Sequence, residues 1–140
     1  MKRVLALDIG TVRIGAAVTD PLGLFAQGIA VWQVREDWRA KFETCLARYD
    51  PELVLIGMPR RTNGNYGPEA EAMSQLVEEL RAAYPDRRFE TWDERYTTVI
   101  AQRALLEADV SRGKRKERVD KVAAALILQN WLDAQRAYPK

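Results

Sequence analysis

A tight turn near the beginning of the chain joins two short apolar segments, residues 3–9 and 13–20, and one carboxylate, Asp8, interrupts the first of them. The connection is too short for a helix, so it predicts two antiparallel strands. Burying an unpaired carboxylate is unfavourable by several kcal/mol. Asp8 therefore needs a partner, and a bound cation, a site for phosphate chemistry and a buried arginine are the candidates. The alternative is an aspartate at the strand end that only starts the turn with Gly10.

The rest of the hydrophobic pattern predicts a single α/β domain over residues 1–140. With 47% hydrophobic residues, a chain of 140 residues can bury a core of its own. We expect three strands followed by alternating helices and strands, which is typical of a mixed sheet flanked by helices. The expected strands are residues 3–9, 13–20, 24–32, 52–57 and 88–93, and the expected helices are residues 36–49, 68–84, 97–109 and 114–136.

The chain has no histidine and one cysteine, Cys45. This composition excludes catalysis by Ser-His-Asp or Cys-His groups, histidine-bound zinc and a thiolate metal cluster. Hydrolytic chemistry would have to use carboxylates, hydroxyls, lysine, arginine and metal ions. We expect Cys45 to lie in the core.

Composition also bears on location and partners. No apolar run approaches the roughly 18 to 20 residues that a membrane span needs, and the N-terminus lacks a signal-peptide pattern. We therefore expect a cytoplasmic protein with no membrane partner. The formal net charge of +2 is too small to indicate nucleic acid by itself, so the distribution of the charges has to decide.

Three polar segments are expected to meet at one edge of the sheet. Strands one, four and five are connected through helices and should run parallel, whereas strand two runs antiparallel to strand one. The carboxyl ends of the parallel strands then share one edge, which is where open α/β sheets bind ligands. Asp8 ends the first strand, residues 56–67 follow the fourth, and residues 91–95 end the fifth.

The last helix adds a carboxylate, Asp120, to this edge. Asp120 lies at helical spacing from apolar residues, so we expect it to face the sheet. These residues are Ala123, Ala124, Ile127 and Trp131. The alternative is a position at the edge of that face, with the carboxylate reaching solvent, or a role at the helix start.

Asp8, Glu94 and Asp120 form the candidate catalytic and metal-binding set. Carboxylates brought together repel one another unless protons or divalent cations neutralise them. Oxygen ligands favour Mg²⁺ or Mn²⁺ over zinc, and two such ions about 4 Å apart suit in-line displacement at a phosphodiester. Such a site needs no histidine.

Two neighbours of Glu94 are ambiguous. Strand alternation turns Asp93 away from Glu94, which makes Asp93 a weaker candidate ligand, and capping the turn before Thr97 is an equal alternative. Arg95 either holds a carboxylate or contacts the scissile phosphate, or it forms a structural salt bridge.

Basic residues gather at the start of the last helix and in the loop after the fourth strand. Cations at a helix N-terminus oppose the helix dipole, and their placement is easier to understand if a polyanion binds there. The alternative is a solvated charged face. The expected nucleic-acid contacts are Arg60, Arg61, Asn63, Arg95, Lys114, Arg115 and Lys116.

Four segments, at residues 8–15, 56–64, 93–98 and 119–124, resemble in order and spacing the motifs of the YqgF family, also called RuvX. Their residues include Asp-Ile-Gly-Thr at the first, Ile-Gly-Met-Pro with Asn-Gly at the second, Asp-Glu-Arg-Tyr-Thr-Thr at the third and Val-Asp-Lys-Val-Ala-Ala at the fourth. The resemblance covers nearly the whole chain. It implies a ribonuclease H-like fold, related to the RuvC Holliday-junction resolvase, and metal-dependent nuclease activity.

The acidic residues of the family match the set already chosen, Asp8, Glu94 and Asp120. Gly10, Thr11 and Arg13 fall in the first motif, and we assign them to the turn that lets a phosphate approach. Members of the family are described as pre-16S rRNA nucleases or as junction resolvases.

This chain departs from the family in one loop. After the proline the family usually has an apolar-Asn-apolar-Asp-Gly sequence, whereas Arg60, Arg61, Thr62 and Asn63 stand here. The loop is thereby basic, which leaves the acidic set untouched and bears on the choice between branched DNA and structured RNA.

We therefore expect a metal-dependent endonuclease that acts on structured nucleic acid, in 5′ processing of pre-16S rRNA during ribosome biogenesis, in Holliday-junction resolution, or in both. The expected cofactor is Mg²⁺ or Mn²⁺, the expected partner is branched DNA or precursor rRNA, and a homodimer is left open. One alternative is a non-catalytic nucleic-acid-binding module of the same fold. Another is a nucleotide-binding domain of the actin and sugar-kinase type, whose phosphate hairpin also reads Asp-x-Gly-Thr, although that architecture needs two such domains.

Overall fold

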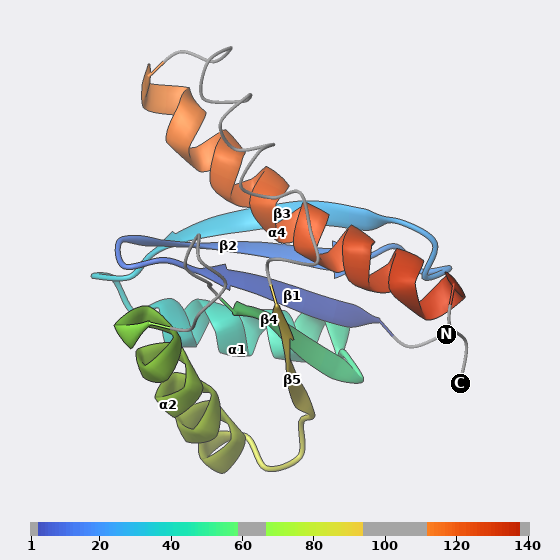
Figure 1. The fold of residues 1–140 in the computed structure, drawn as a ribbon, viewed down its shortest axis with the longest axis horizontal. Coiled ribbons are helices and arrows are strands. Elements are labelled where there is room, and N and C mark those ends of the chain that lie inside the picture. The colour runs from blue at the N-terminus through green and yellow to red at the C-terminus, as the bar shows by residue number, and fades with distance from the viewer. Residues whose placement is uncertain (1–2, 59–66, 94–111, 138–140) are drawn as a thin grey trace.

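The computed structural model describes residues 3–58, 67–93 and 112–137 (Figure 1). The expected strands and the helices at 36–49, 68–84 and 114–136 are present, with ends shifted by one or two residues, and the helix expected at 97–109 lies outside the described residues. In chain order the elements are β1 (Val4–Ile9), β2 (Arg13–Thr19), β3 (Ala26–Gln33), α1 (Trp38–Tyr49), β4 (Leu53–Met58), α2 (Pro68–Ala83), β5 (Phe89–Asp93) and α4 (Arg112–Ala137).

The five strands form one mixed sheet in the order β3-β2-β1-β4-β5. β2 runs antiparallel to both β1 and β3, whereas β4 runs parallel to β1 and β5 runs parallel to β4. The carboxyl ends of β1, β4 and β5 therefore share one edge, as the sequence predicted. The sequences of β1 and β4 are almost entirely apolar because helices cover both faces of these strands.

Helices cover the sheet on both faces, with α1 and α2 on one side and α4 on the other (Figure 1). Side chains alternate along each strand, so Leu5 and Leu7 pack on the α1/α2 face while Val4 and Ala6 pack on the α4 face. Cys45 of α1 is half-buried and packs against the first of these cores, close to the core placement predicted for it.

Small residues let α4 lie close to the sheet. Ala6 of β1 pairs with Ala17 of β2, and Ala17 pairs with Gly28 of β3. A Cβ atom on Gly28 would lie 3.0 Å from the backbone oxygen of Lys121 in α4. A Cβ atom at this position would push α4 away by a few tenths of an ångström, so glycine allows the helix to cross β3 this closely.

Candidate functional site

Asp8 is a buried carboxylate in the central strand of the sheet. It is 9% exposed, and it lies one residue before the carboxyl end of β1. Alternation from Val4 and Ala6 places it on the face that α4 covers. Its partner across the ladder is Gly15 of β2, which has no side chain to fill the space beside the carboxylate. The expected burial of Asp8 at the shared edge is thus present.

The turn after Asp8 is as tight as the sequence predicted. The N–H of Gly10 donates to the backbone oxygen of Arg13 over 2.9 Å, and a Cβ atom on Gly10 would lie 2.9 Å from that same oxygen. The N–H of Val34 donates to the backbone oxygen of Val12 over 2.8 Å, which ties the turn to the end of β3. Thr11 and Val12 are left exposed beside Asp8, so the backbone at this edge is accessible to a ligand.

Asp93 is the second buried carboxylate at this edge. It ends β5, pairs with Met58 of β4 and is 9% exposed. Counting from Phe89, which packs on the α1/α2 face, alternation puts Asp93 on that same face. Trp92, one position earlier, packs with the α4-side core. Asp8 and Asp93 therefore lie on opposite faces of the sheet.

The fourth contributor to the predicted site lies on α4. Asp120 belongs to the first half of this helix, one turn before Ala123 and Ala124, which are buried against the sheet. Lys114, Arg115 and Lys116 belong to its first two turns. The structure describes the helical backbone of these four residues and not their side chains.

The remaining predicted contacts, Glu94, Arg95, Arg60, Arg61 and Asn63, lie outside the described residues. Within residues 3–58, 67–93 and 112–137, no group of three acidic, histidine or cysteine side chains is placed to hold a metal ion. Asp8 supplies the right donor chemistry for Mg²⁺ or Mn²⁺, because it is a buried carboxylate next to an exposed turn. A complete metal-binding set would need Glu94 and Asp120 as well.

One residue that bears on the placement of α4 was not singled out from the sequence. Gly28 was assigned to a strand without a role, although a glycine inside a strand often marks a close approach of another backbone. That signal was present, but its meaning depends on α4, which follows more than eighty residues later.

Comparison with known proteins settles the family. Residues 2–134 match the family described as RuvX, Holliday junction resolvase. This chain belongs to the RuvX family. A relative from Clostridium perfringens, named "Putative pre-16S rRNA nuclease", is 47% identical over 134 residues, which cover 94% of this chain and 96% of the relative. A relative of the same name from Symbiobacterium thermophilum is 45% identical over 139 residues. The alignment covers 98% of this chain and 96% of the relative.

Solved structures confirm the ribonuclease H-like fold of the RuvX chain. RuvC of T. thermophilus in complex with a Holliday junction substrate aligns with a TM-score of 0.55 at 14% identity, covering 97% of this chain and 96% of that one. The yeast mitochondrial Holliday junction resolvase Ydc2 aligns with a TM-score of 0.56 at 12% identity. The alignment covers 98% of this chain and 81% of Ydc2. Among the described residues, no helix is long and apolar enough to span a membrane.

Proposed function

We propose that this chain is a metal-dependent endonuclease that hydrolyses phosphodiester bonds in structured nucleic acid. Its reaction is 5′ processing of pre-16S rRNA, resolution of four-way junctions, or both, and it takes place in the cytoplasm. The observation that carries this proposal is the buried Asp8 at the edge where β1, β4 and β5 end, in a chain of the RuvX family.

In this proposal Asp8, Glu94 and Asp120 hold Mg²⁺ or Mn²⁺. The bound ions would favour attack of water on the phosphate and stabilise the leaving oxygen. The backbone of Asp8 pairs with Gly15 of β2, and the ladder from β1 to β4 ends one residue earlier, at Leu7, so the strand that carries this carboxylate is held on both sides. Gly15 opposite it leaves space for the ligand, and the Gly10 to Arg13 turn brings exposed backbone to the phosphate.

Substrate binding in this proposal rests on positive charge at the same end of the sheet. α4 begins at Arg112, so Lys114, Arg115 and Lys116 add their charge to the positive end of the helix dipole. Arg60, Arg61, Asn63 and Arg95 come from the two segments that follow β4 and β5. Contacts of this kind neutralise phosphates without reading sequence, which suits a substrate recognised by its shape.

The test is cleavage of a four-way junction, a flap and a precursor 16S rRNA in Mg²⁺ and in Mn²⁺. We expect cleavage of at least one substrate, and we expect Asp8→Asn to lower the rate by several orders of magnitude while the protein stays folded. Asp93→Asn is the matched comparison, because Asp93 is buried to the same extent on the opposite face. Near-normal cleavage by Asp8→Asn would contradict the proposed site. Binding without cleavage of any substrate would favour the non-catalytic module.

A further inference from the structure

A pocket with a volume of about 530 Å³ opens between the start of α2 and the carboxyl-terminal parts of β4 and β5. Met58 packs in the core on the α1/α2 face, and Thr91 alternates with Phe89 onto that same face. The pocket, which we call the α2 pocket, therefore lies on the opposite face of the sheet from Asp8. Its described lining residues are Met58, Ala70, Glu71, Ser74, Gln75 and Thr91.

The α2 pocket exists because α2 covers only the first part of β5. At the end of the helix, the guanidinium of Arg81 donates to the backbone oxygen of Phe89 over 2.8 Å. The ring of Tyr84, directly after the helix, lies 6.5 Å from the ring of Phe89. Phe89 is thereby buried, whereas Thr91, two residues later on the same face, is exposed. The helix thus leaves the end of this edge strand accessible to a ligand.

The first two turns of α2 present small and polar side chains to this pocket. Ala70 and Ser74 are one turn apart, and neither is large enough to fill the space above Thr91. Ala70 and Met58 are buried and give the pocket an apolar floor. The hydroxyls of Ser74 and Thr91 and the amide of Gln75 can each donate and accept hydrogen bonds. An apolar floor with a few polar groups around it is typical of a site for a small organic group.

The charge of the pocket excludes a phosphate as its occupant. None of the described lining residues is positively charged, and Glu71 is negatively charged, so a phosphate would be repelled. Glu69 and Glu71 both lie in the first turn of α2, where they offset the positive end of the helix dipole. The pocket therefore suits an uncharged group that has apolar faces and a polar edge. In a nucleic acid, the base is such a group.

We propose that the α2 pocket receives one unpaired base of the nucleic-acid substrate and prefers adenine or cytosine to uracil or thymine. The amide of Gln75 has an acceptor beside a donor, which is the pattern that pairs with the amino group and neighbouring ring nitrogen of adenine. The carboxylate of Glu71 accepts from the amino group of adenine or cytosine and repels the carbonyl oxygens of uracil. This inference rests on the proposed function, because a bound strand has to bring the base to the pocket.

The position of the pocket fits a base a few nucleotides from the reacting phosphate. β1, which carries Asp8, and β5, which carries Thr91, are separated by β4 alone, so they lie about 10 Å apart at about 4.8 Å per strand. Stacked nucleotides advance by about 3.4 Å each, so this separation corresponds to about three nucleotides. A base has to leave its stack to reach the opposite face of the sheet, and an unpaired base does so at the least cost. The pocket would thus favour loops, tails and branch points over continuous duplex.

The test is the binding, without metal ions, of a hairpin RNA that carries a single-stranded uridine tail. One tail position at a time is replaced by adenosine, by cytidine or by an abasic unit, and fluorescence anisotropy gives the Kd of each probe. At one position we expect adenosine to bind at least about fivefold more tightly than uridine or the abasic unit. Gln75→Ala should remove this preference for adenosine.

A matched pair of tryptophan variants locates the preference. Ser74→Trp fills the α2 pocket and should make the adenosine and uridine probes bind equally. Ala82→Trp is the control, because Ala82 is an exposed residue of the same helix two turns further on and does not line the pocket. It should keep the wild-type preference. Melting temperatures of the variants check that they remain folded.

Two results would overturn the inference: equal affinity for all probes at every tail position, or a preference that Ser74→Trp leaves intact. Cleavage assays on the same proteins separate this inference from the proposed function. Cleavage by a protein that shows no base preference would support the nuclease and contradict the pocket. A preference that Ser74→Trp abolishes, in a protein that cleaves no substrate, would support the pocket and contradict the nuclease.

Discussion

The backbone oxygen of Lys121 lies 3.0 Å from the position that a Cβ atom on Gly28 would occupy. Gly28→Ala should force α4 away from β3 by a few tenths of an ångström, and we expect it to destabilise the fold by about 1–3 kcal/mol, as overpacking does. Urea unfolding measures this difference. Gln27→Ala, at the exposed neighbouring position, should change stability by less than about 0.5 kcal/mol. Equal stability of Gly28→Ala and the wild type would show that α4 is free to shift.

The same substitution bears on the proposed catalytic site. Lys121 directly follows Asp120, so displacing α4 at Lys121 also moves the carboxylate that would hold a metal ion. We expect the cleavage rate of Gly28→Ala to fall by at least tenfold under conditions in which the protein is fully folded, because small misplacements in a catalytic site have large effects.

Metal binding should be measurable without any substrate. An ion that binds only the folded state stabilises it by about 2.7 kcal/mol at one hundred times its Kd. We therefore expect Mn²⁺ to raise the Tm of the wild-type protein and of Asp93→Asn, and to leave the Tm of Asp8→Asn nearly unchanged. Thermal unfolding at increasing Mn²⁺ concentration is the measurement. An equal rise in Asp8→Asn would remove Asp8 from the proposed ligand set.

The basic start of α4 predicts a specific dependence on salt. Each phosphate that a lysine or arginine neutralises contributes about 0.7 to 0.9 to the slope of log affinity against log salt concentration. The double variant Lys114→Ala, Lys116→Ala should flatten the slope by roughly one to two units. Fluorescence anisotropy with a junction and a linear duplex gives these slopes.

A control for this experiment lies at the other end of the sheet. Arg48, in the last turn of α1, and Arg88, directly before β5, are exposed and lie near the amino ends of β4 and β5, away from the carboxyl edge. The double variant Arg48→Ala, Arg88→Ala removes the same charge and should leave the slope unchanged. An equal loss of slope in both double variants would mean that net charge, and not the start of α4, governs binding.

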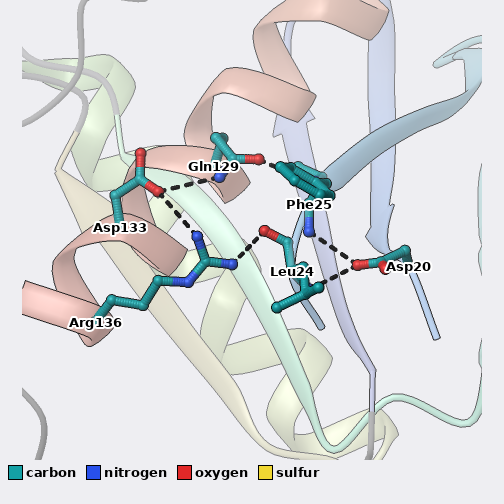
Figure 2. Close-up of polar contacts among 7 residues, drawn as sticks. Asp20, Leu24, Phe25, Gln129, Asp133 and Arg136 are labelled. Atoms are coloured by element: carbon teal, nitrogen blue, oxygen red, sulfur yellow. Dashed lines mark hydrogen bonds and ion pairs between the residues drawn. The ribbon is translucent and has the colours of Figure 1, made fainter. Parts of the chain in front are cut away.

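Asp20 predicts how the loop between β2 and β3 responds to acid. Its carboxylate accepts hydrogen bonds from the N–H groups of Phe25 and Leu24 (Figure 2). The hydrogen bond from Phe25 is the largest effect on the pKa of Asp20; desolvation opposes it, the bond from Leu24 adds to it, and together these effects hold the pKa below its ordinary value of 3.8. A lowered pKa means that the carboxylate stabilises the folded loop above about pH 4, and that this contribution is lost as the pH falls through the lowered pKa. The amide NMR signals of Leu24 and Phe25 should titrate together with a midpoint below 3.8. A midpoint at or above that value would contradict the role of these two bonds.

Asp20 also explains where the sequence prediction of the third strand was wrong. Alternation and apolarity favoured a strand from residue 24, whereas β3 begins at Ala26. The amides of Leu24 and Phe25 donate to Asp20 and not to β2, so they cannot take part in the ladder. A side chain also sets the start of the first helix, which was predicted from residue 36. The carboxylate of Asp37 accepts a hydrogen bond from the N–H of Ala40, so Asp37 is the N-cap and α1 begins at Trp38. The periodicity of hydrophobic residues does not predict short-range polar contacts of this kind.

The relative directions of the strands were predictable because they follow from the lengths of the segments that connect them. A turn of three residues requires antiparallel neighbours, and helical crossovers require parallel ones, so the placement of Asp8 at a shared edge needed no tertiary information. The conformation of the loop between β2 and β3 and the close approach at Gly28 were not predictable in this way. Both depend on where α4 crosses the sheet, and that is decided by packing between segments about a hundred residues apart.

The position of β1 in the middle of the sheet has a consequence for the order in which parts of the molecule open. Amide protons of β1 are shielded by a strand on each side and a helix layer on each face, so they should exchange with solvent only through global unfolding. Glu94, in contrast, directly follows an edge strand, and Asp120 belongs to a helix that covers the sheet from outside. In the proposed site, Asp8 would then be the ligand that keeps its place through every opening short of global unfolding.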